Sequence, residues 1–295
     1  MVSLENWIKI WGEFSNSYMN TIGFWRYSLK NKENAKLLKK NKKFKEIHKG
    51  ERCFILGNGP SLNEIDFSTL KDEYVFTVNE LMLHEHFSEL NSNYHLFADP
   101  AFFEMDYDSN IAKERKCFFE NMGEEVHKTI VFVPIEAKKN IHEIGWLDGM
   151  QLGYWSSQLY FYSGFSEKIN FTKFIPGFWA VIQWAIALAV YMGFKEIYLL
   201  GCEATNAVID VSRLLGMERD KYAFSMNDRQ IQNRDKENEK WNSAECLFYG
   251  YNQIFIYFKE ISHWCDMREV KLVNCSPNTL IESIPKDCFE NIIKR

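Results

Sequence analysis

A short apolar run that stops at a glycine-rich turn constrains the fold of this chain more than any other feature. Residues 53–56 are apolar, and Gly-Asn-Gly-Pro-Ser follows at once at residues 57–61. The run predicts a buried strand, and the two glycines predict a tight turn that lets the backbone approach a ligand. Ser61 is a good N-cap residue, so we expect a helix to begin behind it.

A strand, a glycine turn and a helix N-terminus together form an anion site, because unpaired backbone N–H groups and the helix dipole point at one spot. We therefore expect a nucleotide phosphate at this loop. The loop has neither the Gly-Lys-Ser/Thr of a P-loop nor the third glycine of a dinucleotide fingerprint.

Similar apolar runs recur along the chain and predict its remaining strands. Strands are expected at 53–56, 75–78, 94–97, 129–133, 197–200 and 270–274, with helices over 178–192 and about 244–264. Because the runs are short and do not alternate with polar residues, they are typical of a parallel sheet covered on both faces. The sequence therefore predicts an α/β fold with a Rossmann-like parallel sheet.

Polar residues stand at the ends of most of these strands. They are Asn58, Asn79, Asp99, Glu203, Ser276 and Asn278. In parallel sheets the ligand lies beyond the carboxyl ends of the strands, so we expect these side chains to converge on one site. His84, His86 and His95 lie near strand ends as well, and we interpret them as surface or core residues.

Residues 1–50 differ from the rest and predict a helical arm. Aromatic and aliphatic side chains recur at helical spacing over residues 7–25, and residues 26–49 contain ten basic and two acidic residues. An apolar face followed by a basic run suits the surface of an anionic membrane. The alternative is an arm that packs on its own domain or on another subunit. Residues 51–295 would form the nucleotide-binding domain.

Two segments of that domain have no clear period. Residues 134–175 are rich in aromatic side chains and predict a mobile lid or an acceptor-binding segment. Residues 213–245 include a highly charged stretch, which is typical of a solvated loop and is also compatible with a gate over a substrate.

Bulk properties exclude several classes of protein. A net charge of −5 argues against general nucleic-acid binding. Seven cysteines without CxxC spacing predict reduced thiols in the cytoplasm and no zinc site. Residues 178–194 are uncharged, but the stretch is short for a membrane span and runs directly into a strand. We therefore expect a buried helix there.

Six motifs, in order between residues 52 and 285, give the chain a family resemblance. They are Gly57-Asn58-Gly59-Pro60-Ser61-Leu62 with Ile65-Asp66, the strand at 75–79, Phe97-Ala98-Asp99-Pro100 with 102–104, the junction at 193–201, Tyr222-Ala223-Phe224, and Cys275-Ser276-Pro277-Asn278-Thr279-Leu280. This order resembles the bacterial sialyltransferases of glycosyltransferase family 42. It is also similar to a wider group that shares the Gly-x-Gly-Pro-Ser opening.

The resemblance implies a Rossmann-like, GT-A-like enzyme with a small lid, cytoplasmic and peripheral on the inner membrane. Such an enzyme transfers a nonulosonic acid from a CMP donor to a surface-glycan or lipid-linked acceptor, with inversion and without a required metal or other cofactor. The residues that would bind the nucleotide or donor sugar are Gly57, Asn58, Gly59, Ser61, Asn79, Gly177, Tyr222, Ser276, Pro277 and Asn278.

Two departures from the family pattern affect the chemistry. Asp99 stands where the family has an asparagine, and could hold a sugar hydroxyl, bind a divalent metal such as Mg²⁺ or act as a base. Tyr251 stands where the family has its catalytic histidine, in the sequence Phe-Tyr-Gly-Tyr at 248–251. A tyrosine with an ordinary pKa of about 10 is a poor general base near neutrality. The candidate catalytic residues are therefore Asp99, Glu203 and Tyr251.

Two other functions remain open at this point. The first is a phosphotransferase that uses ATP and Mg²⁺, because the wider group includes proteins that resemble pterin pyrophosphokinases. The second is a non-catalytic nucleotide-binding or assembly protein. The aromatic arm would suit a homo-oligomer as well as a membrane.

Overall fold

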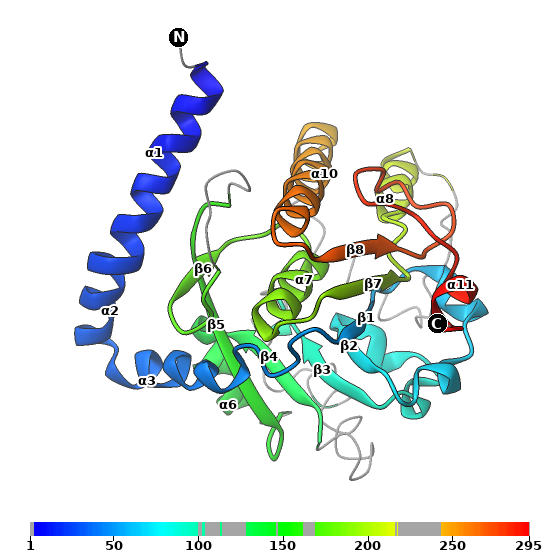
Figure 1. Ribbon diagram of the computed structural model, residues 1–295, viewed down its shortest axis with the longest axis horizontal. Coiled ribbons are helices and arrows are strands. Elements are labelled where there is room, and N and C mark those ends of the chain that lie inside the picture. The colour runs from blue at the N-terminus through cyan, green and yellow to red at the C-terminus, as the bar shows by residue number, and fades with distance from the viewer. Residues whose placement is uncertain are drawn as a thin grey trace.

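An eight-stranded, all-parallel sheet forms the centre of the protein (Figure 1). The computed structural model describes residues 3–99, 102–103, 113, 128–145, 147–161, 169–215, 217 and 243–294. The strands are β1 (Arg52–Leu56), β2 (Tyr74–Val78), β3 (Ser92–Leu96), β4 (Ile130–Pro134), β5 (Gln151–Leu159), β6 (Phe174–Pro176), β7 (Glu196–Leu200) and β8 (Lys271–Asn274). The predicted α/β, Rossmann-like fold is confirmed.

The strand order places a topological switch point between β1 and β7. The order across the sheet is β6-β5-β4-β3-β2-β1-β7-β8. After β1 the chain adds β2 to β6 on one side and then returns to add β7 and β8 on the other. Such a reversal leaves a crevice at the carboxyl ends of the two strands on either side of it, where open α/β sheets bind their ligands.

Helices and shorter helical turns connect and cover the strands. They are α1 (Leu4–Tyr18), η1 (Met19–Gly23), α2 (Phe24–Lys30), α3 (Lys32–Lys40), η2 (Asn41–Phe44), η3 (Pro60–Glu64), η4 (Phe67–Leu70), η5 (Asn79–Leu83), η6 (Phe87–Glu89), η8 (Ile135–Ala137), α6 (Lys138–Ile144), α7 (Val181–Met192), α8 (Asn206–Leu214), α10 (Ala244–Asp266) and α11 (Phe289–Ile293). Here η1 is a π-helix, and the other η elements are 3₁₀ turns.

Each face of the sheet has its own apolar core. Cys53 and Ile55 of β1 belong to the cluster that contains α7 and the second half of α10. Phe54 and Leu56 belong to the cluster on the other face, with residues of α3, α6 and the 3₁₀ turns. After their first residue, β1 and β4 are wholly apolar because both of their faces are buried.

The helix α7 is apolar on nearly all sides and fills the first of these cores. Nine of its twelve residues are buried, including Gln183, whose side chain bonds the backbone at both of its ends. The expectation of a buried helix in place of a membrane span is thus correct for this segment. Within the described residues, no helix combines the length and the hydropathy that a membrane crossing needs.

Two expectations about local structure are wrong. Ser61 does not open an α-helix, because η3 is a five-residue 3₁₀ turn that ends at Glu64, and a second 3₁₀ turn follows it. Residues 134–175 are not a lid over the sheet: β5 and β6 lie within this segment and form one side of the sheet. The charged part of the second expected lid, 218–242, lies outside the described residues.

The expected domain boundary at residue 50 also shifts. Residues 35–44 belong to the main domain, since Ala35, Leu38 and Phe44 are buried in its cores. Asn41 is buried as well, and its Nδ2 donates hydrogen bonds to the carbonyl oxygens of Tyr154 (2.5 Å) and Phe171 (2.9 Å). Phe24 of α2 is buried in the same cluster as Ala35 and Leu38, so α1 is the part of the arm that stands out from the domain (Figure 1).

Asn41→Ala should destabilise the whole domain. The substitution leaves two buried carbonyl groups without a donor, at an expected cost of about 2–4 kcal/mol in the free energy of unfolding. Asn31→Ala, at an exposed position between α2 and α3, is the matched control and should change that free energy by less than about 0.5 kcal/mol. Urea unfolding of both variants provides the measurement, and equal effects would contradict the revised boundary.

Candidate functional site

The turns that follow β1 and β7 are bonded to each other along their length. Leu56 and Leu200 are paired in register, so the two strands end at the same level. Beyond them, the amide of Gly57 donates to the carbonyl of Leu200 and the amide of Gly59 to that of Gly201, both at 2.8 Å. The amide of Ser61 then donates to Oε1 of Glu203 at 3.0 Å.

This contact explains the two glycines of the opening motif. A Cβ on Gly57 would lie 2.3 Å from the carbonyl oxygen of Gly201, and one on Gly59 would lie 1.4 Å from Oε2 of Glu203. Both positions must be glycine because the β7 turn packs directly against them. The sequence analysis attributed the glycines to close approach of a ligand, whereas the structure shows the approach of another turn.

The backbone amides that were expected to bind a phosphate already donate hydrogen bonds within the protein. The amides of Gly57, Gly59 and Ser61 bond the β7 turn, and a carboxylate accepts from the third of them. The short 3₁₀ turn behind Ser61 also lacks the dipole of a long helix. A phosphate at these amides would have to displace Glu203, whose negative charge would repel it.

Four buried oxygen atoms at this edge have no hydrogen-bond partner within the described part of the chain. They are Oδ1 of Asn58, Oγ of Ser61, Oδ1 of Asn79 and Oε2 of Glu203. Glu203 and Ser61 are only 3% and 9% exposed. Buried polar atoms nearly always have partners, and several unpartnered ones together at a switch point indicate a binding site.

The sheet register brings these residues together. Leu56 of β1 pairs with Thr77 of β2, so Asn58 and Asn79 each lie two residues beyond a paired position. Glu203 reaches the same place from the other side of β1, through its contact with Ser61. The structure thus places Asn58, Asn79 and Glu203, three of the six polar residues expected to converge, at one edge of the sheet with Ser61.

Asn79 is held in an unusual backbone conformation. Its φ is 48°, in the left-handed region that asparagine tolerates better than most residues. Nε2 of His95 donates to its carbonyl oxygen at 3.1 Å, and Nδ1 of His95 accepts from the Thr77 hydroxyl at 2.8 Å. His95 is therefore a buried positioning residue, and a polar residue inside an apolar strand was the sequence signal for it.

Burial determines the protonation state of His95. Desolvation lowers its pKa from 6.5 to about 3, although the hydrogen bond to the Asn79 carbonyl acts in the opposite direction. The ring is therefore neutral near pH 7. A neutral ring has one donor and one acceptor nitrogen, which is what the Asn79 carbonyl and the Thr77 hydroxyl require.

The loop after β8 is tied to the β7 turn. Oγ of Ser276 accepts from the amide of Cys202 at 2.7 Å, and Nδ2 of Asn274 donates to the Cys202 carbonyl at 3.1 Å. The amide of Leu280 donates to the Glu203 carbonyl at 2.8 Å. Ser276 thus has a structural role, while Pro277 and Asn278 are exposed, the latter with a φ of 55°.

Tyr251 is bonded to a carboxylate that the sequence analysis did not select. Its hydroxyl donates to Oδ2 of Asp210 at 2.5 Å, which links α10 to α8. An aspartate on an amphipathic helix looks like a surface residue, so the sequence had no signal for Asp210.

The remaining predicted residues lie apart from this cluster. Asp99 is exposed just beyond β3, two strands from β1. Gly177 follows β6 at the far edge of the sheet, five strands or about 24 Å from β1. It therefore does not share a site with Asn58. Tyr222 lies outside the described residues.

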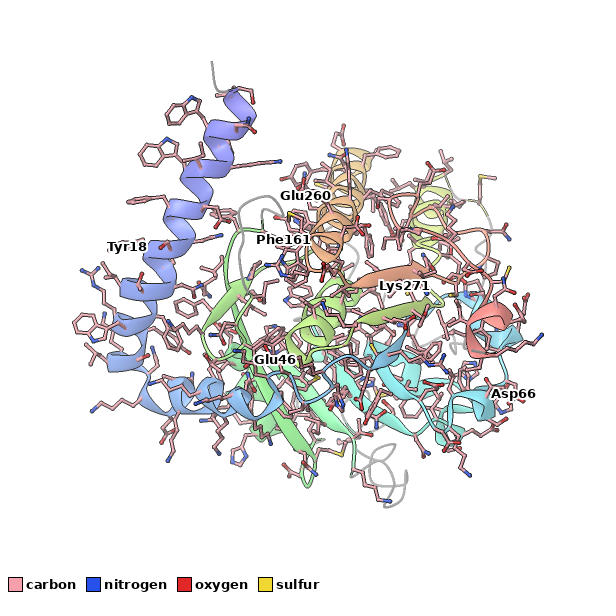
Figure 2. All side chains as sticks on the ribbon, viewed as in Figure 1. Tyr18, Glu46, Asp66, Phe161, Glu260 and Lys271 are labelled. Atoms are coloured by element: carbon pink, nitrogen blue, oxygen red, sulfur yellow. The ribbon has the colours of Figure 1, made fainter. Side chains whose placement is uncertain are left out.

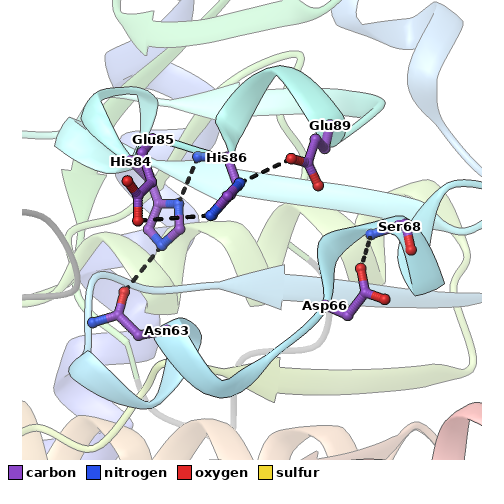
Figure 3. A network of polar contacts seen from close by, with 7 residues as sticks. All are labelled: Asn63, Asp66, Ser68, His84, Glu85, His86 and Glu89. Carbon is purple, nitrogen blue, oxygen red and sulfur yellow. Dashed lines mark hydrogen bonds and ion pairs between the residues drawn. The ribbon is translucent and has the colours of Figure 1, made fainter.

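A polar network connects the turns that follow β1 and β2 (Figure 3). The His84 ring accepts from the amide of His86 through Nδ1, so its Nε2 donates to Oδ1 of Asn63 at 3.2 Å. Burial lowers the pKa of His84 and keeps its ring neutral. The hydrogen bond to Glu89 raises the pKa of the exposed His86. The network fixes η3 against η5 and η6, and hence Asn58 near Asn79.

Other parts of the described chain offer less. A pocket of about 370 Å³ lies between α3 and α6, but several of its charged groups pair with one another or with neighbours, as Lys138 does with Glu33. Among the described residues, no three His, Cys, Asp or Glu side chains are grouped as a metal ion would require. The strand-end cluster is therefore the candidate site.

Gly59→Ala should destabilise the protein by about 1–3 kcal/mol, because the new methyl group overlaps the Glu203 carboxylate. Gly177→Ala is the matched control: its Cβ would have only Ser157 Cβ within 4 Å, at 3.8 Å, so stability should stay within about 0.5 kcal/mol. Adding Glu203→Ala to Gly59→Ala should recover part of the loss. If the two substitutions changed the free energy of urea unfolding by strictly additive amounts, the contact between Gly59 and Glu203 would be contradicted.

Below the ordinary pKa of histidine, the free energy of unfolding should decrease as the pH decreases. Between about pH 6.5 and pH 3 the unfolded chain protonates His95 while the folded protein does not, which costs up to about 1.4 kcal/mol per pH unit. His95→Gln keeps a donor for Asn79 but cannot titrate, so its stability should fall less steeply. Urea unfolding between about pH 7 and pH 5 gives the slopes, and parallel slopes would exclude this role.

Comparison with known proteins does not name this site. No model of a known protein family matches the chain, and no curated protein matches it either.

Proposed function

We propose that the protein is a glycosyltransferase that binds a nucleotide-activated sugar at the carboxyl ends of β1, β2 and β7. One observation carries this proposal: four unpartnered, buried oxygen atoms lie together at the switch point of a parallel sheet. They belong to Asn58, Ser61, Asn79 and Glu203. The resemblance of the strand-end motifs to sialyltransferases supports the same class.

The chemistry of these atoms favours one part of such a donor. Amide and carboxylate oxygens accept hydrogen bonds, and only the Ser61 hydroxyl can also donate. Phosphate oxygens accept as well and would leave the cluster unsatisfied, whereas ribose and sugar hydroxyls bring donors. We therefore propose that Glu203, Asn58 and Asn79 bind hydroxyl groups of the donor, as carboxylates at strand ends bind ribose in other α/β proteins.

The donor phosphate would then lie nearer the loop after β8. Pro277 and Asn278 of this loop are exposed. Nζ of Lys286 donates to the Thr279 carbonyl at 3.2 Å and places a positive charge beside the loop. A cation at the departing phosphate would stabilise the negative charge that develops on it.

The proposed transfer is a single displacement. An acceptor hydroxyl attacks the anomeric carbon, the bond from that carbon to the phosphate oxygen breaks, and the nucleotide leaves with the bonding electrons. The hydroxyl proton passes to a carboxylate. We assign this role to Asp99, because it is exposed at the sheet edge where an acceptor could enter, while Glu203 is enclosed beside the donor.

Thermal unfolding with a panel of nucleotides tests donor binding. CMP, UMP, GMP and AMP would each be compared with the parent nucleoside and its 2′,3′-dideoxy form, with and without Mg²⁺. We expect one nucleotide to raise the Tm, its nucleoside to retain part of the shift and the dideoxy form to lose it. Glu203→Gln should abolish most of the shift, and the exposed control Glu282→Gln should not.

Turnover tests the reaction itself. With the nucleotide sugar that binds, Asp99→Asn should lower kcat by about 10²–10⁴-fold and leave donor affinity unchanged. No shift with any nucleotide would contradict the proposal. ATP is measured in the same assay with and without Mg²⁺, and a shift that appears only with ATP and Mg²⁺ would favour a phosphotransferase instead.

A further inference from the structure

The helices α1 and α2 carry a continuous apolar face that the rest of the described chain does not cover. Its side chains are Leu4, Trp7, Ile8, Trp11, Phe14, Tyr18, Ile22, Trp25 and Leu29, which are 41–77% exposed. They recur every three or four residues and therefore form one stripe. Figure 2 shows Tyr18 on the side of α1 that points away from the domain.

The opposite side of the same helices holds them against the domain. Nδ2 of Asn16 donates to the Tyr160 carbonyl at 2.7 Å, and the Tyr160 amide donates to Oδ1 of Asn16 at 2.9 Å. Nζ of Lys9 lies 3.8 Å from a carboxylate oxygen of Glu260 in α10. Phe24 is buried against Phe174 of β6, with ring centroids 5.2 Å apart. The apolar face is thus not needed to dock the helices.

A cluster of positive charge begins where the apolar face ends. The exposed lysines of residues 30–49 are Lys30, Lys32, Lys36, Lys39, Lys40, Lys42, Lys43, Lys45 and Lys49. Glu33 and Glu46 are the two acidic residues of this segment, although the whole chain has 40 acidic and 35 basic residues. Positive charge is therefore concentrated in the segment that follows the apolar face along the chain, and Lys30, Lys32 and Lys36 are the lysines nearest to that face in sequence.

We propose that the apolar face of α1 and α2 lies on an anionic lipid surface, with Lys30, Lys32 and Lys36 at the lipid headgroups. Tryptophan is enriched at membrane interfaces, and this face presents three, Trp7, Trp11 and Trp25. The two helices with η1 extend for about 40 Å, enough for an in-plane contact. A second copy of the chain could cover the apolar stripe but would bring lysines of the same sign, whereas an anionic bilayer complements both features.

This surface makes no use of the strand-end site, so its test is independent of catalysis. Co-sedimentation would compare vesicles of phosphatidylcholine mixed with phosphatidylglycerol against vesicles of phosphatidylcholine alone. The wild-type protein should bind the mixed vesicles, and added NaCl should weaken binding. Replacement of Lys30, Lys32 and Lys36 by Gln should reduce the partition coefficient about 100-fold, because each lysine contributes a factor of roughly five. Replacement of the exposed Lys71, Lys259 and Lys294 should not change it.

A second variant tests the apolar stripe. Trp7→Ser, Trp11→Ser and Phe14→Ser together should reduce binding by at least about tenfold, with unfolding unchanged because all three are exposed. Sedimentation without lipid provides the competing outcome. If the wild-type protein is a dimer that does not bind vesicles, and this variant is a monomer, the apolar face binds a second copy of the chain. That result would overturn the proposal. Equal binding to both kinds of vesicle would also overturn it.

Discussion

The contact between the turns after β1 and β7 is the constraint on which the candidate site depends. Three amides of the first turn bond the second, and the Glu203 carboxylate lies against the backbone of Gly59. This packing requires glycine at positions 57 and 59. It also buries a carboxylate between the turns that follow β1 and β7, where a charged group is costly unless something satisfies it. The geometry of Asn58 and Ser61 follows from the same contact.

The same constraint reverses the chemistry that the glycine turn suggests by itself. A free glycine turn ahead of a helix offers donors, which suits phosphate. Here the donors are used within the protein, and the atoms that remain are acceptors. A ligand that supplies hydroxyl groups matches them better than one that supplies only phosphate oxygens. His95 and the network around His84 then hold the turns of β2 in place with neutral rings, which avoids adding charge to the site.

Much of the fold was predictable because its signals are local. The apolar runs at 53–56, 75–78 and 197–200 became β1, β2 and β7 with shifts of about one residue. The uncharged run at 178–194 became the buried helix α7. In contrast, β5 and β6 were missed because residues 134–175 show no clear period. They are strands because β5 pairs with β4 and β6 pairs with β5. The hydrogen bond between Tyr251 and Asp210 joins residues 41 positions apart, which no local pattern reveals.

The sequence by itself determined the α/β class, the parallel sheet and the polar residues at the strand ends, because hydrophobic runs and turn residues act over a few neighbours. It also determined the apolar and basic character of the first 50 residues. Only the tertiary structure decided what those residues face. Strand order placed Glu203 beside Ser61 and Gly177 at the far edge, and the docking of Asn16 turned the tryptophans of α1 outward. These outcomes depend on contacts between segments distant in the chain, and such contacts leave no periodic pattern in the sequence.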